Sequence, residues 1–145
     1  MSDINDVIGK INACNTLSDI KTPDFLDAET GYAHIVAKNS IKQNLNTTQL
    51  RKFFAALKKM EQKTTWNEIE TEFYLLKPRM AVAVGRKNLP KPFYEVTLAA
   101  MGKVDNVESD DEKMKNFDIF VKFFEAIVAY HKYEEEMSKA QKRRY

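Results

Sequence analysis

The chain has 145 residues, of which 43% are hydrophobic, and a formal net charge of +2, a composition typical of one domain that folds without disulfides or metal ions. Charged residues interrupt each apolar run well before the ~20 residues that a membrane span requires, so we expect no membrane partner. The single cysteine, Cys14, excludes an intramolecular disulfide, and with no signal-like start it favours a cytoplasmic protein.

Residues 1–22 are polar, acidic and weakly patterned. A residue that precedes proline is biased away from the helical conformation, so Thr22-Pro23 weakens any helix across this junction. We therefore expect residues 1–22 to form an N-terminal arm that is mobile or folds as a loosely docked short helix. The domain itself then covers residues 23–137.

Three helices are expected before Pro78. The first covers residues 24–39 and is weakened by Gly31 near its start. The second begins at Asn46 and the third at Thr65, because each of these capping residues is followed three positions later by Gln or Glu. The third helix must kink or stop before Pro78, which has no backbone N–H to donate.

Two further helices follow a short segment of small apolar residues at 79–86. Pro90 and Pro92 open a helix that ends near Gly102. Ser109 caps the last and longest helix, in which apolar residues recur at helical spacing. These residues are Phe117, Phe120, Val121, Phe124, Ile127, Val128 and His131.

The predicted fold is all-α: a single compact bundle of about five or six helices, with a long C-terminal helix and a flexible N-terminal arm. Only four glycines and no Asn-Gly or Asp-Gly turns are present, which argues against β-sheets. Residues 138–145 form a basic tail. A helix extension, a partner contact or disorder would each account for that tail.

Charge is distributed unevenly along the chain. Residues 1–30 carry 2 basic and 6 acidic side chains, residues 31–103 carry 13 and 5, and residues 104–145 carry 8 and 10. The basic centre includes the helix at 46–63, where apolar and cationic residues occupy separate stripes. The apolar stripe comprises Leu50, Phe53, Phe54, Leu57 and Met60. The cationic stripe comprises Arg51, Lys52, Lys58, Lys59 and Lys63.

A second concentration of positive charge surrounds the proline-rich turns. It comprises Lys77, Arg79, Arg86, Lys87 and Lys91, with Tyr74, Phe93 and Tyr94 nearby as possible stacking groups. Two such clusters lining one groove would suit a phosphate backbone. The alternative is that the cations are ordinary solvated helix residues and the aromatic rings belong to the core.

No catalytic or metal-binding motif is apparent, and we predict no catalytic residue, no metal site and no cofactor. His34 and His131 are far apart in sequence and neither has a metal-ligand spacing, so structural roles are favoured for both. Cys14 has no nearby base to activate it as a nucleophile. The carboxylates at 110–112 are explained by their position at a helix N-terminus.

Three segments, read together, resemble the small helical subunit of the type III-A CRISPR-Cas (Csm) interference complex. They are Leu45-Asn46-Thr47-Thr48-Gln49-Leu50-Arg51-Lys52-Phe53, Ala83-Val84-Gly85-Arg86 and Phe123-Phe124-Glu125-Ala126-Ile127-Val128-Ala129-Tyr130. Their order and spacing also match, and the similarity extends from about Ile35 to Tyr133. The chain departs from the family pattern after Tyr133, where a charged end replaces a short glycine-containing one.

The resemblance implies an all-helical subunit without catalytic activity, stacked in several copies along a ribonucleoprotein filament. It implies as partners the crRNA-target RNA duplex, held by its backbone, together with the backbone and large subunits of the Csm complex and neighbouring copies. Cleavage of RNA belongs in this family to the backbone subunits, and cleavage of DNA and synthesis of cyclic oligoadenylate to the large subunit. Arg51 and Arg86 occupy the motif arginines. The full set of expected RNA contacts is Arg51, Lys52, Lys58, Lys59, Arg79, Arg86 and Lys87.

Two other functions stay open from the sequence. One is a self-associating helical adaptor whose basic face is merely solvated, and the other is a nuclease that pairs His34 or His131 with a carboxylate. Salt-dependent RNA binding separates the RNA-binding subunit from the adaptor. Metal-dependent turnover by the isolated protein would indicate the nuclease.

Overall fold

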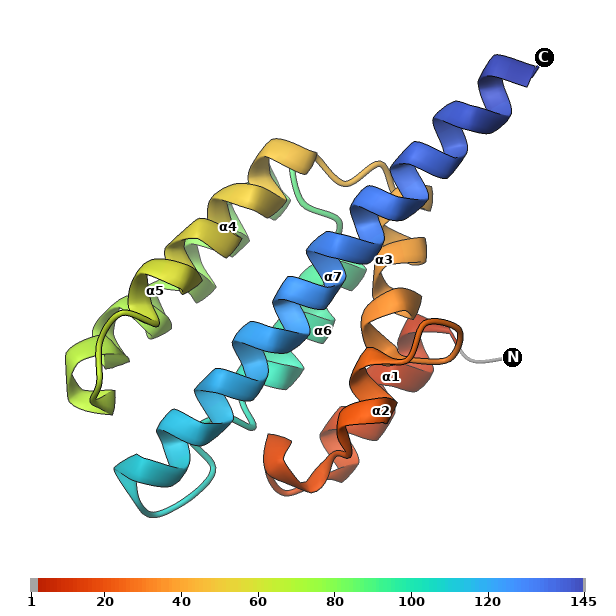
Figure 1. The fold of residues 1–145 in the computed structure, drawn as a ribbon. Coiled ribbons are helices and arrows are strands. Elements are labelled where there is room, and N and C mark those ends of the chain that lie inside the picture. The colour runs from red at the N-terminus through yellow and green to blue at the C-terminus, as the bar shows by residue number, and fades with distance from the viewer. Residues whose placement is uncertain (1–2, 145) are drawn as a thin grey trace.

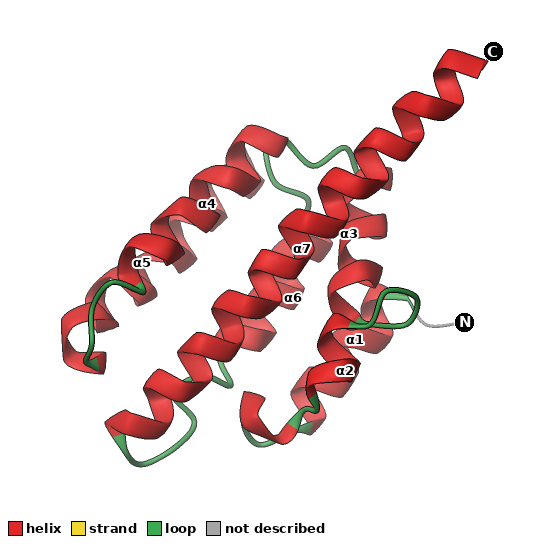
Figure 2. Ribbon diagram, in the orientation of Figure 1, coloured by secondary structure: helices red, strands yellow, loops and turns green. Residues whose placement is uncertain are grey.

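Helices account for every regular element in residues 3–144, which are the residues that the computed structural model describes (Figure 2). The elements are α1 (Ile4–Ala13), a 3-10 turn η1 (Leu17–Asp19), α2 (Thr22–Leu26), α3 (Tyr32–Lys42), α4 (Thr47–Met60), α5 (Trp66–Gly85), α6 (Lys91–Met101) and α7 (Asp110–Arg144). The predicted all-α class and the long C-terminal helix are confirmed. None of the described helices is long and apolar enough to cross a bilayer.

The long helix α7 organises the bundle (Figure 1). On one side of it lies α3, together with α1 and α2, and on the other lies the antiparallel pair α4 and α5. Helix α6 packs against α1, α3 and α5. The core is rich in aromatic rings, and its largest fully buried side chains include Phe73, Phe93, Phe117, Phe120, Phe123 and Phe124.

Residues 1–22 were expected to be either mobile or a loosely docked short helix. Within this segment residues 4–13 form helix α1, which is packed firmly rather than loosely. Asp3 caps α1 through a reciprocal capping box, and α1 packs against α6 and α3. Ile4, Val7 and Ile11 are buried in the core. Since burial of each such side chain contributes about 1.5–3 kcal/mol, residues 4–13 belong to the domain rather than to a separate arm.

The first helix expected from sequence is in fact two helices, α2 and α3, separated by residues 27–31. The Asp27 carboxylate accepts hydrogen bonds from the backbone N–H groups of Glu29 and Thr30, each at 3.0 Å, which folds the chain into a turn. A Cβ on Gly31 would lie 2.4 Å from the Asp27 carbonyl oxygen. The turn therefore requires glycine at 31, and this requirement ends one helix and starts the next.

Helix α5 passes through Pro78 without ending, so the helix stop that was one of the two expected outcomes is wrong. The proline costs the helix one backbone hydrogen bond, that of the carbonyl four residues earlier. Pro78 is exposed, so solvent can satisfy the carbonyl on that face of the helix. Buried side chains on both sides of the proline, Phe73, Leu76 and Met80, hold the continuous helix against the core.

Helix α7 begins after Ser109, whose hydroxyl accepts a hydrogen bond from the Glu112 backbone N–H at 3.2 Å. It continues helically as far as Arg144, so most of the predicted tail is an extension of this helix. Figure 1 shows the end of α7 projecting beyond the other helices. Tyr145 lies outside the described residues.

Candidate nucleic-acid interface

Helices α4 and α5 form an antiparallel pair joined by the turn at 61–65 (Figure 1). The Asn46 side chain caps α4 by accepting a hydrogen bond from the Gln49 backbone N–H at 3.1 Å, as the capping pattern predicted. The apolar stripe of α4 is buried at Leu50, Phe53, Leu57 and Met60. Burial of this stripe fixes the rotation of α4 and leaves its cations at the surface.

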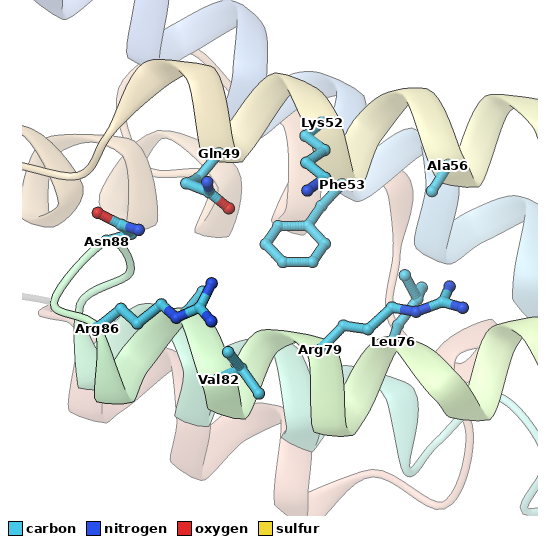
Figure 3. Close-up of a pocket in the computed structure, with 10 residues that line it drawn as sticks. Gln49, Lys52, Phe53, Ala56, Leu76, Arg79, Val82, Arg86 and Asn88 are labelled. Atoms are coloured by element: carbon cyan, nitrogen blue, oxygen red, sulfur yellow. The ribbon is translucent and has the colours of Figure 1, made fainter.

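A groove of about 420 Å³ lies between α4 and α5 near the start of α4 and the end of α5. We call it the α4–α5 groove. Figure 3 shows Phe53 pointing from α4 into the space between the helices, with Arg79 on α5 and Arg86 at its C-terminal end to either side of Val82. Its lining residues are Gln49, Lys52, Phe53, Ala56, Leu76, Arg79, Val82, Ala83, Arg86 and Asn88.

Three of the seven cations expected to contact RNA meet at this groove. Lys52 comes from α4, Arg79 comes from α5 and Arg86 directly follows α5. All three side chains are exposed. Among the described residues, no carboxylate lies within ion-pair distance of Lys52 or Arg86, while Arg79 Nη1 lies 3.3 Å from Glu72 Oε2. One cation of the first basic cluster and two of the second therefore line one groove, and the other members of both clusters do not.

The remaining four cations lie outside the α4–α5 groove. Lys58 is directed toward acidic side chains, with its Nζ 2.7 Å from Glu61 Oε1 and 3.9 Å from Glu125 Oε1. The hydrogen bond to Glu61 raises the pKa of Lys58. Lys58 is thus paired within the protein, which leaves less of its charge for an external phosphate.

The positive charge of Arg51 contributes to lowering the pKa of His131, which is buried on α7. Arg51 is therefore close enough to α7 to act on that ring. Lys59 borders a second hollow of about 370 Å³ between α4 and α5, where Glu68 and Glu72 are also present. Lys87 follows α5 in a left-handed conformation with φ of 62°. The side chains of Arg51, Lys59 and Lys87 are exposed, and none of them lines the α4–α5 groove.

Sequence reasoning missed the two amide side chains of the groove, Gln49 and Asn88. Gln49 precedes Lys52 by three residues, so helical spacing places the two side chains on one face of α4. Asn88 follows α5 in a turn where its backbone N–H donates to the Ala83 carbonyl oxygen at 2.9 Å. Nothing in the local sequence indicates that this turn brings Asn88 back to α4.

His34 has a structural role. Its Nε2 lies 2.7 Å from Glu134 Oε1 on α7, and its Nδ1 faces the Ala28 carbonyl oxygen. The ring stacks on Tyr130 with centroids 4.4 Å apart, and the Tyr130 hydroxyl donates to the Leu26 carbonyl oxygen at 2.7 Å. These contacts tie α3 and the end of α2 to α7.

Burial shifts the pKa values of His131 and Cys14. His131 is 2% exposed, and burial lowers its pKa, although Glu135 opposes the shift. Burial raises the pKa of the Cys14 thiol, which disfavours the reactive thiolate. The described residues contain no group of three or more His, Cys, Asp or Glu side chains that could hold a metal ion.

Comparison with protein families places this geometry in context. A family model described as Csm2 Type III-A matches residues 26–137, which include all of α3 to α6 and most of α7. Comparison with curated proteins and with solved structures found no match. The matched segment contains every lining residue of the α4–α5 groove.

Proposed function

Because the chain belongs to the Csm2 type III-A family, the small subunit of the type III-A CRISPR-Cas complex, we propose that it binds the backbone of the crRNA-target RNA duplex. The proposed contact surface is the α4–α5 groove together with the exposed cations around it, Arg51, Lys59 and Lys87. Lys58 is a weaker contributor because it is paired with Glu61.

The convergence of Lys52, Arg79 and Arg86 from two helices is the observation that carries the proposal. Exposed like charges repel one another in the free protein, and a polyanion removes that repulsion when it binds. A surface cation that only served solubility would gain from a nearby carboxylate. Lys52 and Arg86 have none within ion-pair distance among residues 3–144.

Backbone recognition suits a subunit that must accept any guide sequence. Contacts to phosphates position a protein on nucleic acid without reading its bases, and RNA-guided complexes leave sequence recognition to base pairing. Arginine and lysine can supply these contacts at any point along a duplex. We propose on the same grounds that the chain itself is non-catalytic and that cleavage belongs to other subunits.

The proposed protein partners are the backbone and large subunits of the Csm complex and neighbouring copies of this chain. Outside the α4–α5 groove, helix α5 exposes Tyr74 and Leu75, which are 38% and 37% exposed. Exposed apolar surface of this kind is more typical of a surface that contacts protein than of one that contacts only water. Family membership and this apolar surface both support assembly into a larger particle.

Salt-dependent RNA binding tests the proposal. Affinity for a duplex should fall as salt rises, with a slope of about −0.7 to −0.9 in log–log form per phosphate contacted. Two unrelated duplexes of equal length should bind with similar affinity. A flat salt response, or strong preference for one sequence, would contradict backbone binding, and concentration-dependent self-association without RNA binding would favour the adaptor.

Reversing two groove cations locates the surface. The double variant Lys52→Glu, Arg86→Glu should lose at least about tenfold in RNA affinity at low salt, because repulsion replaces attraction at two phosphates. Lys38→Glu, Lys115→Glu is the matched control, since both lysines are exposed and lie on α3 and α7. Equal losses in the two double variants would mean that net charge, not the groove, governs binding.

A further inference from the structure

The α4–α5 groove combines positively charged side chains with an apolar floor. Phe53, Ala56, Leu76 and Ala83 line the groove beneath the cations, and Val82 lines it as an apolar side chain that is 52% exposed. A site that only followed phosphates would gain nothing from apolar surface, because phosphate oxygens do not bury against it. The groove instead suits a ligand that has both an anionic group and a flat apolar body.

Arg79 and Val82 lie three residues apart on α5, and Arg86, the residue that caps its C-terminal end, follows at position i+7, so all three lie along one face. The two arginine positions are about 10 Å apart along the helix axis, with Val82 between them. Guanidinium groups bind phosphate and also stack on the planar faces of bases. A base lying on Val82 would therefore meet an apolar surface below and a guanidinium at one or both edges.

Gln49 and Asn88 complete the lining at the end of the groove where Arg86 lies (Figure 3). Each amide offers both a donor and an acceptor, so it can hydrogen-bond to the edge of any base. Lys52 supplies a compact positive charge suited to a phosphate oxygen. The volume of about 420 Å³ falls within the range of sites for small organic ligands.

We propose that the α4–α5 groove holds one unstacked base of the bound RNA, with an adjacent phosphate contacted by Lys52 and the two arginines. This inference rests on the proposed function and names what the same site accepts: an unpaired nucleotide within an otherwise backbone-bound strand. Stacking on a planar face is tolerant of sequence, because every base has such a face. Occupation of the groove by a base is thus compatible with binding to any guide.

The test compares three synthetic RNA duplexes of the same length: fully paired, with one internal bulged nucleotide, and with an abasic residue in place of that nucleotide. The full-length protein should bind the bulged duplex at least about fivefold more tightly than either of the others. Changing the bulged base from adenine to uracil should alter affinity much less. Fluorescence anisotropy at fixed salt measures all four.

A matched pair of variants separates the base from the backbone. Val82→Gln removes the exposed apolar surface of the groove without changing charge, whereas Leu75→Gln makes the same change on α5 outside the groove lining. Val82→Gln should lose the preference for the bulged duplex, so that it binds the bulged and the paired duplex with similar affinity. Leu75→Gln should behave as the wild type in both respects.

The outcomes distinguish this inference from the function beneath it. Equal affinity for all three duplexes, with steep salt dependence retained, would overturn the base site and leave backbone binding intact. Preference for the bulge that survives in Val82→Gln would also overturn the site, because the base would then bind elsewhere. Absence of salt-dependent binding to any duplex would overturn the proposed function itself.

Discussion

The two sides of α7 use their polar side chains in opposite ways. On the α3 side, His34 bonds to Glu134 and stacks on Tyr130, whose hydroxyl is bonded to the Leu26 carbonyl oxygen. In the α4–α5 pair, Lys52 and Arg86 are exposed and have no carboxylate within ion-pair distance among residues 3–144.

This difference distinguishes polar side chains that stabilise the fold from polar side chains that are available to bind a ligand. A polar group with an internal partner contributes to the free energy of unfolding, and removing the partner leaves it unsatisfied. A solvated cation without a partner contributes little to that free energy and remains free to bind an anion. Substitutions on the α3 side should therefore change stability, and those in the α4–α5 groove should change binding.

The largest effect is expected at the junction of the two sides, where Phe124 is 1% exposed. Its ring lies 5.9 Å from that of Phe93 and 6.2 Å from that of Phe54, centroid to centroid. Phe124→Ala should lower the free energy of unfolding by about 3–5 kcal/mol, through lost transfer energy and a residual cavity. Urea denaturation followed by circular dichroism measures this loss, and a change below about 1 kcal/mol would mean that the core relaxes to fill the space.

A smaller effect is expected from Glu134→Ala on the α3 side. The variant removes the carboxylate that His34 contacts at 2.7 Å. It should destabilise the protein by about 1–2 kcal/mol, as expected for a charge-assisted hydrogen bond that is partly open to solvent. Its affinity for RNA should stay unchanged.

Glu108→Ala, an exposed carboxylate before α7, is the control for Glu134→Ala. It should shift stability by less than about 0.5 kcal/mol. If Glu134→Ala also impaired RNA binding as strongly as the groove variants, the division between the two sides of α7 would be wrong.

Acidification should weaken the domain through His131. Burial lowers the pKa of His131 from its ordinary value of 6.5, so the folded protein keeps the ring neutral where the unfolded chain already binds a proton. The stability that this contributes is fully present above about pH 6.5 and is lost as pH falls below it. Glu135 on α7 raises the pKa of His131 and Arg51 on α4 lowers it, and burial is the largest of the three effects.

The measurement is the free energy of unfolding at about pH 7.5 and about pH 5.5. The wild type should lose more stability between these values than His131→Gln does. The pKa of Glu135 is lowered from 4.5, so carboxylates of this kind lose their contribution to stability only at more acidic pH. They therefore affect the wild type and His131→Gln nearly equally. A larger loss in His131→Gln would show that the ring is protonated in the folded state.

The smallest effect is expected from deleting residues 139–145. In that segment Lys139 forms exposed ion pairs with Glu135 and Glu136, at 3.9 Å and 3.7 Å. Exposed pairs of this kind are worth about 0–1 kcal/mol, so the melting temperature should barely change. A loss comparable with that of Phe124→Ala would mean that the end of α7 is docked rather than projecting.

Local sequence signals predicted the helices best where a cap and an apolar stripe agreed. Asn46 starts α4 and Ser109 precedes α7 as expected, since a cap depends on residues only three apart. Local reasoning did not exclude a helix stop at Pro78, where the helix continues because packing of Phe73 and Met80 outweighs one missing hydrogen bond. It also underrated residues 4–13, whose apolar positions have value only against α6 and α3.

The sequence by itself determined the all-α class and the separation of charge along the chain, because these follow from composition and helical periodicity. The seven candidate cations came from the basic clusters together with the family resemblance. Tertiary structure decided which cations act together. Lys52 and Arg86 meet at one groove, whereas Lys58, six residues beyond Lys52 on the same helix, pairs with Glu61 and approaches Glu125. Periodicity gives the face of a helix on which a side chain lies, but the partner across that face depends on how distant segments pack together.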